Sequence, residues 1–490
     1  MAELKKKILT SALENALGMA ALYGNLAWHN FVGIYSAEEI EDALFEKINS
    51  RELQVARSEK NGRLIHVLSE GYLSGGHTRV VERLVAAGAG VLGQDVVVTG
   101  LLPGVIADRL RQHGAVVTFV RATGVTAIAE LGRLIGAYTS AVLHIHPDDI
   151  SAVLAARLAR QAGTRVGLYN HADHVFTFGH TACDVVLEVS IYGRAISKKY
   201  RPAHHWSFAG IPLDAPAAPA KSGADEYILS SGPAYKYDFR EGGVFASLLV
   251  NLIAATNRKC LIVGPGKLPP DASNELKELA RVGLLQMEGE VSRDVYVQYL
   301  AGCFCYLDSA PVSGGSAFPE AALAGKECLG LTNPIMGYSP ADAMRSTSVD
   351  ELVRRARNLS GDGLDPLHRL ISEVHDPKQV LDRIERALVD GTVYGIPFDV
   401  QIGAIDSEFM QKGWARNQRL DLRGRAGESL SLANRAAVLR LLWRTGLMGR
   451  VRWLRLLQFC CDSFAFRRIR GDGAADVPKV VLSVMRGKRG

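Results

Sequence analysis

Short apolar runs alternate with amphipathic stretches along the chain from about residue 60 onward. This alternation predicts parallel sheets with helices on both faces, because strands buried on both faces read as continuous apolar runs. In the first half of the chain the predicted strands are RLIHVLSE, DVVVTG, AVVTFV, AVLHIH, RVGLYN, DVVLEV and HWSFAG.

A stretch rich in proline and alanine, residues 212–224, interrupts the alternation and is the predicted linker. The alternation then restarts with the runs YILSS, KCLIVG, LLQMEG, CFCYLD and ECLGL. We therefore expect an α/β protein with two Rossmann-like domains, residues 61–211 and 225–390, whose sheets face a common cleft. Residues 1–60 are predicted to be an N-terminal helical extension, and residues 391–490 a C-terminal extension with a basic amphipathic tail.

Composition narrows the class of protein. An apolar fraction of 48% and a charged fraction of 22% are ordinary globular values and argue against global disorder. The cysteines lack the C-x-x-C spacing of a zinc site, which favours reduced thiols and a cytoplasmic location. The longest weakly polar run, GGVFASLLVNLIAAT, is too short to span a membrane.

The net charge of +6 is unevenly distributed. Residues 435–490 contain 13 Lys and Arg against 3 Asp, a balance of +10, which leaves −4 for the rest of the chain. Trp443 and Trp453 lie among these basic residues, which suits a helix at the anionic inner face of a membrane. A packed helix with solvated arginines is the alternative. No nucleic-acid partner is expected, since its basic contacts would more often cover a folded face.

Loops that follow predicted strands carry the candidate chemistry of the second domain. SSGPAYKYD places Lys236 after its first strand, and APVSGGSAF places Gly314, Gly315 and Ser316 just before a helix. A cation and a turn with unpaired backbone N–H groups suit a diphosphate, and the carboxylate of Glu320 could accept both hydroxyls of a ribose. The alternatives are a solvated lysine, a tight turn and a carboxylate favoured by the first helical turn.

Arg293, in GEVSRDVY, begins another helix near the same edge and is a further candidate contact for the same ligand. Its spacing alone, however, favours a solvated side chain. Histidines are the candidate bases of the first domain. His77 follows a Gly-Gly pair, and NHADH places His171 after a strand, where either could take a proton from a hydroxyl. A structural hydrogen bond is the alternative for each.

Two further points concern the histidines. His144 and His146 alternate along AVLHIH, so at most one is expected to face the cleft.

A zinc site is the alternative role for the histidines of HADH, but no Cys or Glu joins them at a familiar spacing, and no D-x-D stretch is present. We therefore expect neither a metal nor a cofactor.

The segments PAYKYD, GEVSRDVYVQYLAGCFCYLD and SGGSAFPEAALAG, together with the GGHTRVV loop, resemble GT-B glycosyltransferases, most of all the O-GlcNAc-transferase-like branch. The resemblance covers roughly residues 60–390. It implies that Lys236, Gly315 and Ser316 hold the donor diphosphate and that Glu320 holds the ribose. The chain departs from that branch in lacking its helical-repeat array, and Val312 stands where retaining enzymes of a neighbouring branch carry a glutamate.

The sequence thus predicts a metal-independent glycosyltransferase that moves a hexosyl or N-acetylhexosaminyl group from a nucleoside-diphosphate sugar, UDP-linked, to a hydroxyl of a glycan or lipid-linked acceptor. Bacterial surface-glycan assembly is the expected setting. One alternative is a nucleotide-sugar epimerase, in which Asp148, Asp149 or Asp173 would remove a sugar proton. The other is a nucleotide- or glycan-binding protein without catalysis.

Overall fold

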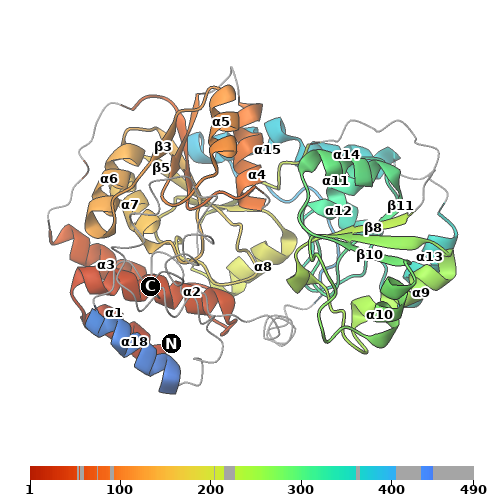
Figure 1. The fold of residues 1–490 in the computed structure, drawn as a ribbon. Helices are drawn as coiled ribbons and strands as arrows, with labels where there is room; N and C mark the ends of the chain where they lie inside the picture. The colour runs from red at the N-terminus through yellow and green to blue at the C-terminus, as the bar shows by residue number, and fades with distance from the viewer. Residues whose placement is uncertain are drawn as a thin grey trace, which may run out of the picture.

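The computed structural model describes residues 1–51, 55, 60–73, 76–88, 93–202, 205–214, 227–359, 365–403 and 432–444. Two α/β units lie side by side in it (Figure 1). The first is built on a seven-stranded sheet and the second on a five-stranded sheet.

The first sheet has the strand order β3-β2-β1-β4-β5-β6-β7, and each neighbouring pair of strands is parallel. Its strands are β1 (Leu64–Leu68), β2 (Gln94–Val98), β3 (Val117–Phe119), β4 (Ser140–His144), β5 (Arg165–Tyr169), β6 (Val185–Glu188) and β7 (Trp206–Phe208). The order reverses between β1 and β4, so the loops after these two strands diverge and leave space for a ligand at that edge.

Helices cover both faces of the first sheet. They are α4 (Gly76–Ala87), α5 (Gly104–Gln112), α6 (Gly124–Gly136), α7 (Ile150–Gln161) and α8 (Ile191–Tyr200). Side chains alternate along each strand, so Ile65 and Val67 of β1 join the cluster that contains α6 and α7, whereas Leu64 and Leu68 join the clusters that contain α4. This alternation decides which polar side chains of a strand share a layer with α4.

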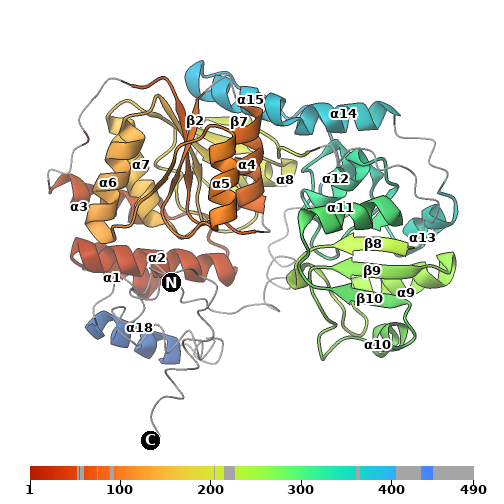
Figure 2. The same cartoon turned by 45° about the horizontal axis from the view of Figure 1, so that its top comes forward.

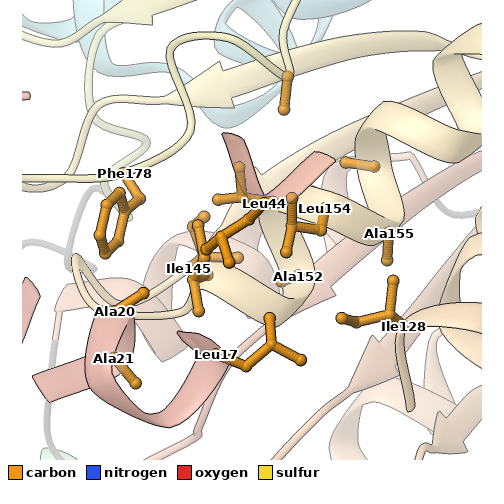
Figure 3. Close-up of a cluster of buried hydrophobic side chains, with 14 of the residues drawn as sticks. Leu17, Ala20, Ala21, Leu44, Ile128, Ile145, Ala152, Leu154, Ala155 and Phe178 are labelled. Carbon is orange, nitrogen blue, oxygen red and sulfur yellow. The ribbon is translucent and has the colours of Figure 1, made fainter. Parts of the chain in front are cut away.

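Three N-terminal helices pack beneath the first domain. They are α1 (Ala2–Thr10), α2 (Leu13–His29) and α3 (Glu38–Asn49). Leu17 of α2 and Leu44 of α3 are buried in one continuous cluster with Ile128 of α6 and Leu154 of α7 (Figure 3). These helices are therefore part of the first domain's core. α18 (Leu432–Arg444) lies against the same layer in both views, and its Val438 joins the cluster (Figures 1 and 2).

The second sheet has the order β10-β9-β8-β11-β12, again parallel. Its strands are β8 (Tyr227–Ser231), β9 (Lys259–Val263), β10 (Leu285–Glu288), β11 (Cys303–Leu307) and β12 (Cys328–Leu329). Its helices are η1 (Ala234–Lys236), α9 (Val244–Thr256), α10 (Asn274–Arg281), α11 (Arg293–Gly302), α12 (Ala317–Leu323), η2 (Pro340–Met344), α13 (Val349–Arg357) and α14 (Asp365–His375).

The chain returns to the first domain through α15 (Pro377–Val389), which packs against β5, β6, β7 and α4 (Figure 2). The two segments that cross between the domains are hydrogen-bonded to each other. The amide of Leu213 donates to the carbonyl oxygen of His375 at 2.9 Å, and His375 Nδ1 donates to the carbonyl oxygen of Ile211 at 2.7 Å. The two crossings therefore form one joint.

The fold class expected from the sequence is confirmed, since two parallel α/β sheets appear in the predicted order with the strands near their predicted places. The exact domain bounds stay predictions. Most of the predicted linker (residues 215–224) and most of the predicted basic tail (residues 445–490) lie outside the described residues. In the described part of the chain, no helix combines the length and apolar character needed to cross a membrane.

Candidate active site

The loop between β11 and α12 is held in shape by Asp308. Both oxygens of its carboxylate accept the backbone N–H of Gly314 at 3.0 Å. Arg345 donates through Nη2 to Asp308 at 2.8 Å and through Nε to Asp342 at 2.6 Å. Asp342 in turn accepts the backbone N–H groups of Gly337 and Tyr338 at 2.8 and 2.9 Å. One buried guanidinium thus orders two loops.

The charges of this cluster are buried and matched. The side chains of Arg345, Asp308 and Asp342 are 1%, 0% and 3% exposed. Burial alone would lower the pKa of Arg345, but the two carboxylates raise it above its ordinary value, so the guanidinium remains charged. We call these three residues the Arg345 cluster.

Lys236 lies against the same loop. The backbone amide of Val312 donates to its carbonyl oxygen at 3.4 Å, and Tyr237 forms an antiparallel bridge with Pro311. This pairing brings Lys236 Nζ to 3.0 Å from the carbonyl oxygen of Ser313. Burial lowers the pKa of the Lys236 ammonium from its ordinary value. The structure therefore places the lysine beside the Gly-Gly-Ser turn, although the two are far apart in sequence.

The two glycines of the turn are needed for close packing. A Cβ on Gly314 would lie 2.8 Å from Asp308 Oδ1, and a Cβ on Gly315 would lie 3.3 Å from the ring of Tyr338. The amide of Gly314 is used by Asp308, which the sequence did not reveal. Within the described residues, the amides of Gly315 and Ser316 have no hydrogen-bond acceptor, so they are the ones available to an anion.

Glu320 and Arg293 form an ion pair that extends to the first domain. Glu320 Oε1 accepts from Arg293 and from Arg83 of α4, the latter at 3.1 Å. Arg83 also donates to Asp214 at 2.9 Å and to the carbonyl oxygen of Pro212 at 3.0 Å. No hydrogen bond from a described residue reaches Glu320 Oε2, which leaves this oxygen as a possible acceptor for a ligand hydroxyl.

A cavity of about 540 Å³ opens beside this ion pair. Side chains of α4, α5, α11 and the first turn of α15 line it. Of the described residues, its lining includes Arg293 but not Lys236, Gly315 or His171, so the cavity adjoins the candidate site rather than containing it.

The two candidate bases lie together in the first domain. His171 follows β5, His77 is the second residue of α4, and their ring centroids are 4.0 Å apart. His171 Nε2 is 2.9 Å from Nδ1 of the buried His144. Burial lowers the pKa of His77 to about 3 and that of His171 well below its ordinary value. Both rings are therefore neutral near pH 7, so each carries a lone pair on one of its two nitrogens.

Tyr338 connects the histidine loop with the glycine loop. Its hydroxyl donates to Asp173 at 3.0 Å, two residues after His171, while its ring packs on Gly315. Next to it, the amide of Ile191 donates to the carbonyl oxygen of Gly337 at 2.9 Å. The loop with the candidate base and the loop with the candidate anion site therefore meet across the domain interface.

The carboxylates considered for an epimerase are engaged in structural contacts. Asp149 is 0% exposed and accepts the hydroxyls of Ser69 and Thr99 and the amide of Ala152 at the start of α7. Asp173 accepts from Tyr338, as above, and from Ser190. Asp148 accepts the side-chain amide of Asn25 at 3.1 Å.

Sequence reasoning missed several residues that the structure brings to the site. Arg83, Asp308, Tyr338, Asp342 and Arg345 carry its interdomain and loop contacts. A carboxylate directly after the apolar run of β11 was a usable signal for Asp308. In the described part of the chain, no group of three or more His, Cys, Asp or Glu is arranged to hold a metal ion.

No family model matches this chain, and no curated protein sequence matches it. Among solved structures, it is similar to Anabaena Alr3699/HepE in complex with UDP and glucose, with 15% identity, 67% of this chain and 100% of that chain covered, and a TM-score of 0.48. A mutant Thermobaculum terrenum O-GlcNAc transferase matches at 14% identity over 84% of this chain and 82% of that chain, with a TM-score of 0.46. A glycosyltransferase from Rickettsia africae matches at 14% identity over 68% of this chain and 100% of that chain, with a TM-score of 0.49. At these values the likenesses assign no activity to this chain.

Replacing Arg345 with leucine tests the loop scaffold. The variant leaves Asp308 and Asp342 buried without a counter-charge, so we expect the free energy of unfolding to fall by about 3–5 kcal/mol. Denaturant unfolding measures this free energy. Arg345→Lys keeps the charge but cannot donate to both carboxylates, so its free energy of unfolding should lie between those of Arg345→Leu and the wild type. Arg281→Leu, which removes an exposed arginine of α10, is the control and should change nothing. Equal stability of Arg345→Leu and wild type would contradict the scaffold role.

Proposed function

We propose that this protein is a metal-independent glycosyltransferase whose donor is a nucleoside-diphosphate sugar, UDP-linked. One observation carries the proposal. A partly buried cation, Lys236, and the amides of Gly315 and Ser316 lie at the carboxyl edge of the second sheet, and Tyr338 connects their loop to the loop of His171. A charge-neutralising site next to a base is what transfer to a hydroxyl requires.

Each group has a distinct task in this proposal. Lys236 turns from the Ser313 carbonyl to the diphosphate and, with the amides of Gly315 and Ser316, stabilises the charge that develops on the leaving group. Glu320, held through Oε1 by Arg293, accepts ribose hydroxyls through Oε2. His171 takes the proton of the attacking hydroxyl, with His77 as the second candidate base.

The contacts of the acidic residues favour transfer over epimerisation. An epimerase needs a carboxylate free to remove a proton from the sugar, whereas Asp149 and Asp173 are buried in structural hydrogen bonds and the partly buried Asp148 accepts the side-chain amide of Asn25. Turnover of a UDP-sugar with and without a hydroxyl acceptor separates a transferase, an epimerase and a non-catalytic binder. A glycan or lipid-linked acceptor in bacterial surface-glycan assembly completes the proposal.

The donor site is tested first by Lys236→Ala. Removing a charged hydrogen-bond donor should weaken UDP binding by about 1.5–3 kcal/mol, or roughly 10- to 150-fold in Kd. Isothermal titration calorimetry measures this directly. Lys277→Ala, on the exposed side of α10, is the matched control and should bind UDP as the wild type does. Unchanged affinity in Lys236→Ala would remove this residue from the donor site.

The base is tested by His171→Ala, which should cut turnover by about 10²–10⁴-fold while UDP affinity stays the same. Because the pKa of His171 is lowered, the ring stays unprotonated as the pH falls, and the acidic limb of the wild-type profile should lie well below pH 6.5. His113→Asn, at an exposed position, is the control. If His77→Ala shows the loss and His171→Ala does not, the two roles are exchanged; if neither does, the base is elsewhere.

Attachment to an anionic membrane is the last part of the proposal. The exposed side chains of α18 include Arg440, Trp443 and Arg444, whereas Arg435 is buried, and residues 445–490 add a balance of +7. Each basic residue near anionic lipid contributes about 1 kcal/mol, and salt screens this contribution. In liposome co-sedimentation, the full chain should pellet at low salt and less at high salt, and a chain ending at Arg444 should pellet less. Equal pelleting of both chains would leave the tail without a membrane role.

A further inference from the structure

Four polar side chains form a continuous hydrogen-bonded row beneath the candidate base. Gln94 Oε1 is 2.7 Å from His66 Nε2, His66 Nδ1 is 3.0 Å from His144 Nε2, and His144 Nδ1 is 2.9 Å from His171 Nε2. Gln94, His66 and His144 are 4%, 0% and 0% exposed. We call these four residues the histidine row.

The row crosses the sheet diagonally. Gln94 is the first residue of β2, His66 the third of β1, and His144 the last of β4, while His171 lies two residues beyond β5. These four strands are neighbours in the order β2-β1-β4-β5. The row therefore begins at the amino edge of the sheet and ends at its carboxyl edge, where ligands of parallel sheets bind.

The first member gives the row a direction. Gln94 Nε2 donates to the carbonyl oxygen of Leu84 at 3.2 Å, so its Oε1 faces His66. With the amide turned over, two carbonyl oxygens would face each other and a buried N–H···O bond would be lost. Gln94 is thus an acceptor towards His66, and His66 carries its proton on Nε2.

The hydrogen bonds of the following rings run in the same donor-to-acceptor direction. A neutral imidazole has one N–H donor and one acceptor nitrogen. Since His66 donates through Nε2, its Nδ1 accepts from His144 Nε2–H, and His144 Nδ1 then accepts from His171 Nε2–H. The rings are neutral near pH 7, because burial lowers the pKa of His66 to about 4 and those of His144 and His171 well below the ordinary value.

We propose that Gln94, His66 and His144 are positioning residues that fix His171 as its Nε2–H tautomer, so that Nδ1 is the atom that accepts the proton of the attacking hydroxyl. The catalytic meaning of this assignment rests on the proposed function, whereas the tautomer itself does not. A base held in the wrong tautomer presents an N–H instead of a lone pair and cannot take a proton.

Burying the polar side chains of the row costs free energy, which a purely structural role does not explain. The neighbouring positions on the same face of these strands, such as Leu64, Leu68 and Val142, are apolar and pack in the layer that contains α4. Buried imidazoles in such a layer require every polar atom to be paired, and among the described residues the ring nitrogens of His66 and His144 are paired only with other members of the row. The one end of the row that is not closed by this pairing is His171 Nδ1, for which the described residues provide no hydrogen-bond partner.

The tautomer can be observed without any assay of activity. Long-range proton–nitrogen NMR spectra of protein labelled with ¹⁵N-histidine distinguish protonated from unprotonated ring nitrogens, and His171→Asn assigns the His171 signals. At neutral pH, wild-type His171 should be protonated on Nε2 and unprotonated on Nδ1. A wild-type His171 that is protonated on Nδ1, or that averages between both tautomers, would overturn the proposal.

Two substitutions test the direction of the row. Gln94→Met removes the terminal acceptor with little change in volume, so the His171 signals should move towards the average of two exchanging tautomers. Ser140→Ala, at another buried polar position on β4 outside the row, is the matched control and should keep the wild-type pattern. An unchanged His171 pattern in Gln94→Met would show that Gln94 does not set the direction.

A kinetic measurement tests the positioning role. In Gln94→Met, turnover of the UDP-sugar should fall by about 10- to 100-fold, the cost typical of losing a hydrogen-bonding partner that orients a metal-ligating histidine, while the Kd for UDP stays at the wild-type value. Wild-type turnover in Gln94→Met would overturn the positioning role. If the wild type transfers no sugar at all, the proposed function fails, and the NMR spectra still decide the tautomer independently.

Discussion

A single buried guanidinium, that of Arg345, fixes the geometry on which the rest of the site depends. Its charge is balanced by Asp308 and Asp342, and each carboxylate uses its remaining capacity to hold the backbone of a separate loop. The cost of burying three charges is offset because the hydrogen bonds are charge-assisted and nearly all donors are paired. Asp308 holds the amide of Gly314 and so shapes the turn against which Lys236 lies.

The second organising contact joins the two halves of the proposed chemistry. Tyr338, ordered by Asp342, reaches Asp173 in the loop that also carries His171. Small displacements of a base or of an anion site slow catalysis strongly. The contact of Tyr338 with both loops therefore matters more for the geometry of the site than the energy of its one hydrogen bond suggests. The position of the base is therefore coupled to the same buried charges that shape the turn.

Periodicity was sufficient to predict the strands, the helices and the loops that gather at the carboxyl edges, because each of these depends on local burial. It also predicted that Lys236 and the glycine turn lie at the same edge of the second sheet. Side-chain contacts between residues far apart in the sequence could not be predicted in this way. Arg83 and Glu320 are 237 residues apart, and nothing near either one indicates the other. The direction of the histidine row depends on an amide, Gln94, whose contacts come from two different elements. Histidines inside the apolar runs of β1 and β4 were the only local sign of that row.

The joint between the domains has a mechanical consequence. Because the outgoing and returning segments are hydrogen-bonded to each other at Leu213 and His375, a rotation of one domain against the other would be expected to pivot near this joint. Displacement grows with distance from a pivot. Arg83 binds the carbonyl oxygen of Pro212 within this joint, so its contact with Glu320 lies close to the pivot and would be displaced less by such a rotation than contacts farther away.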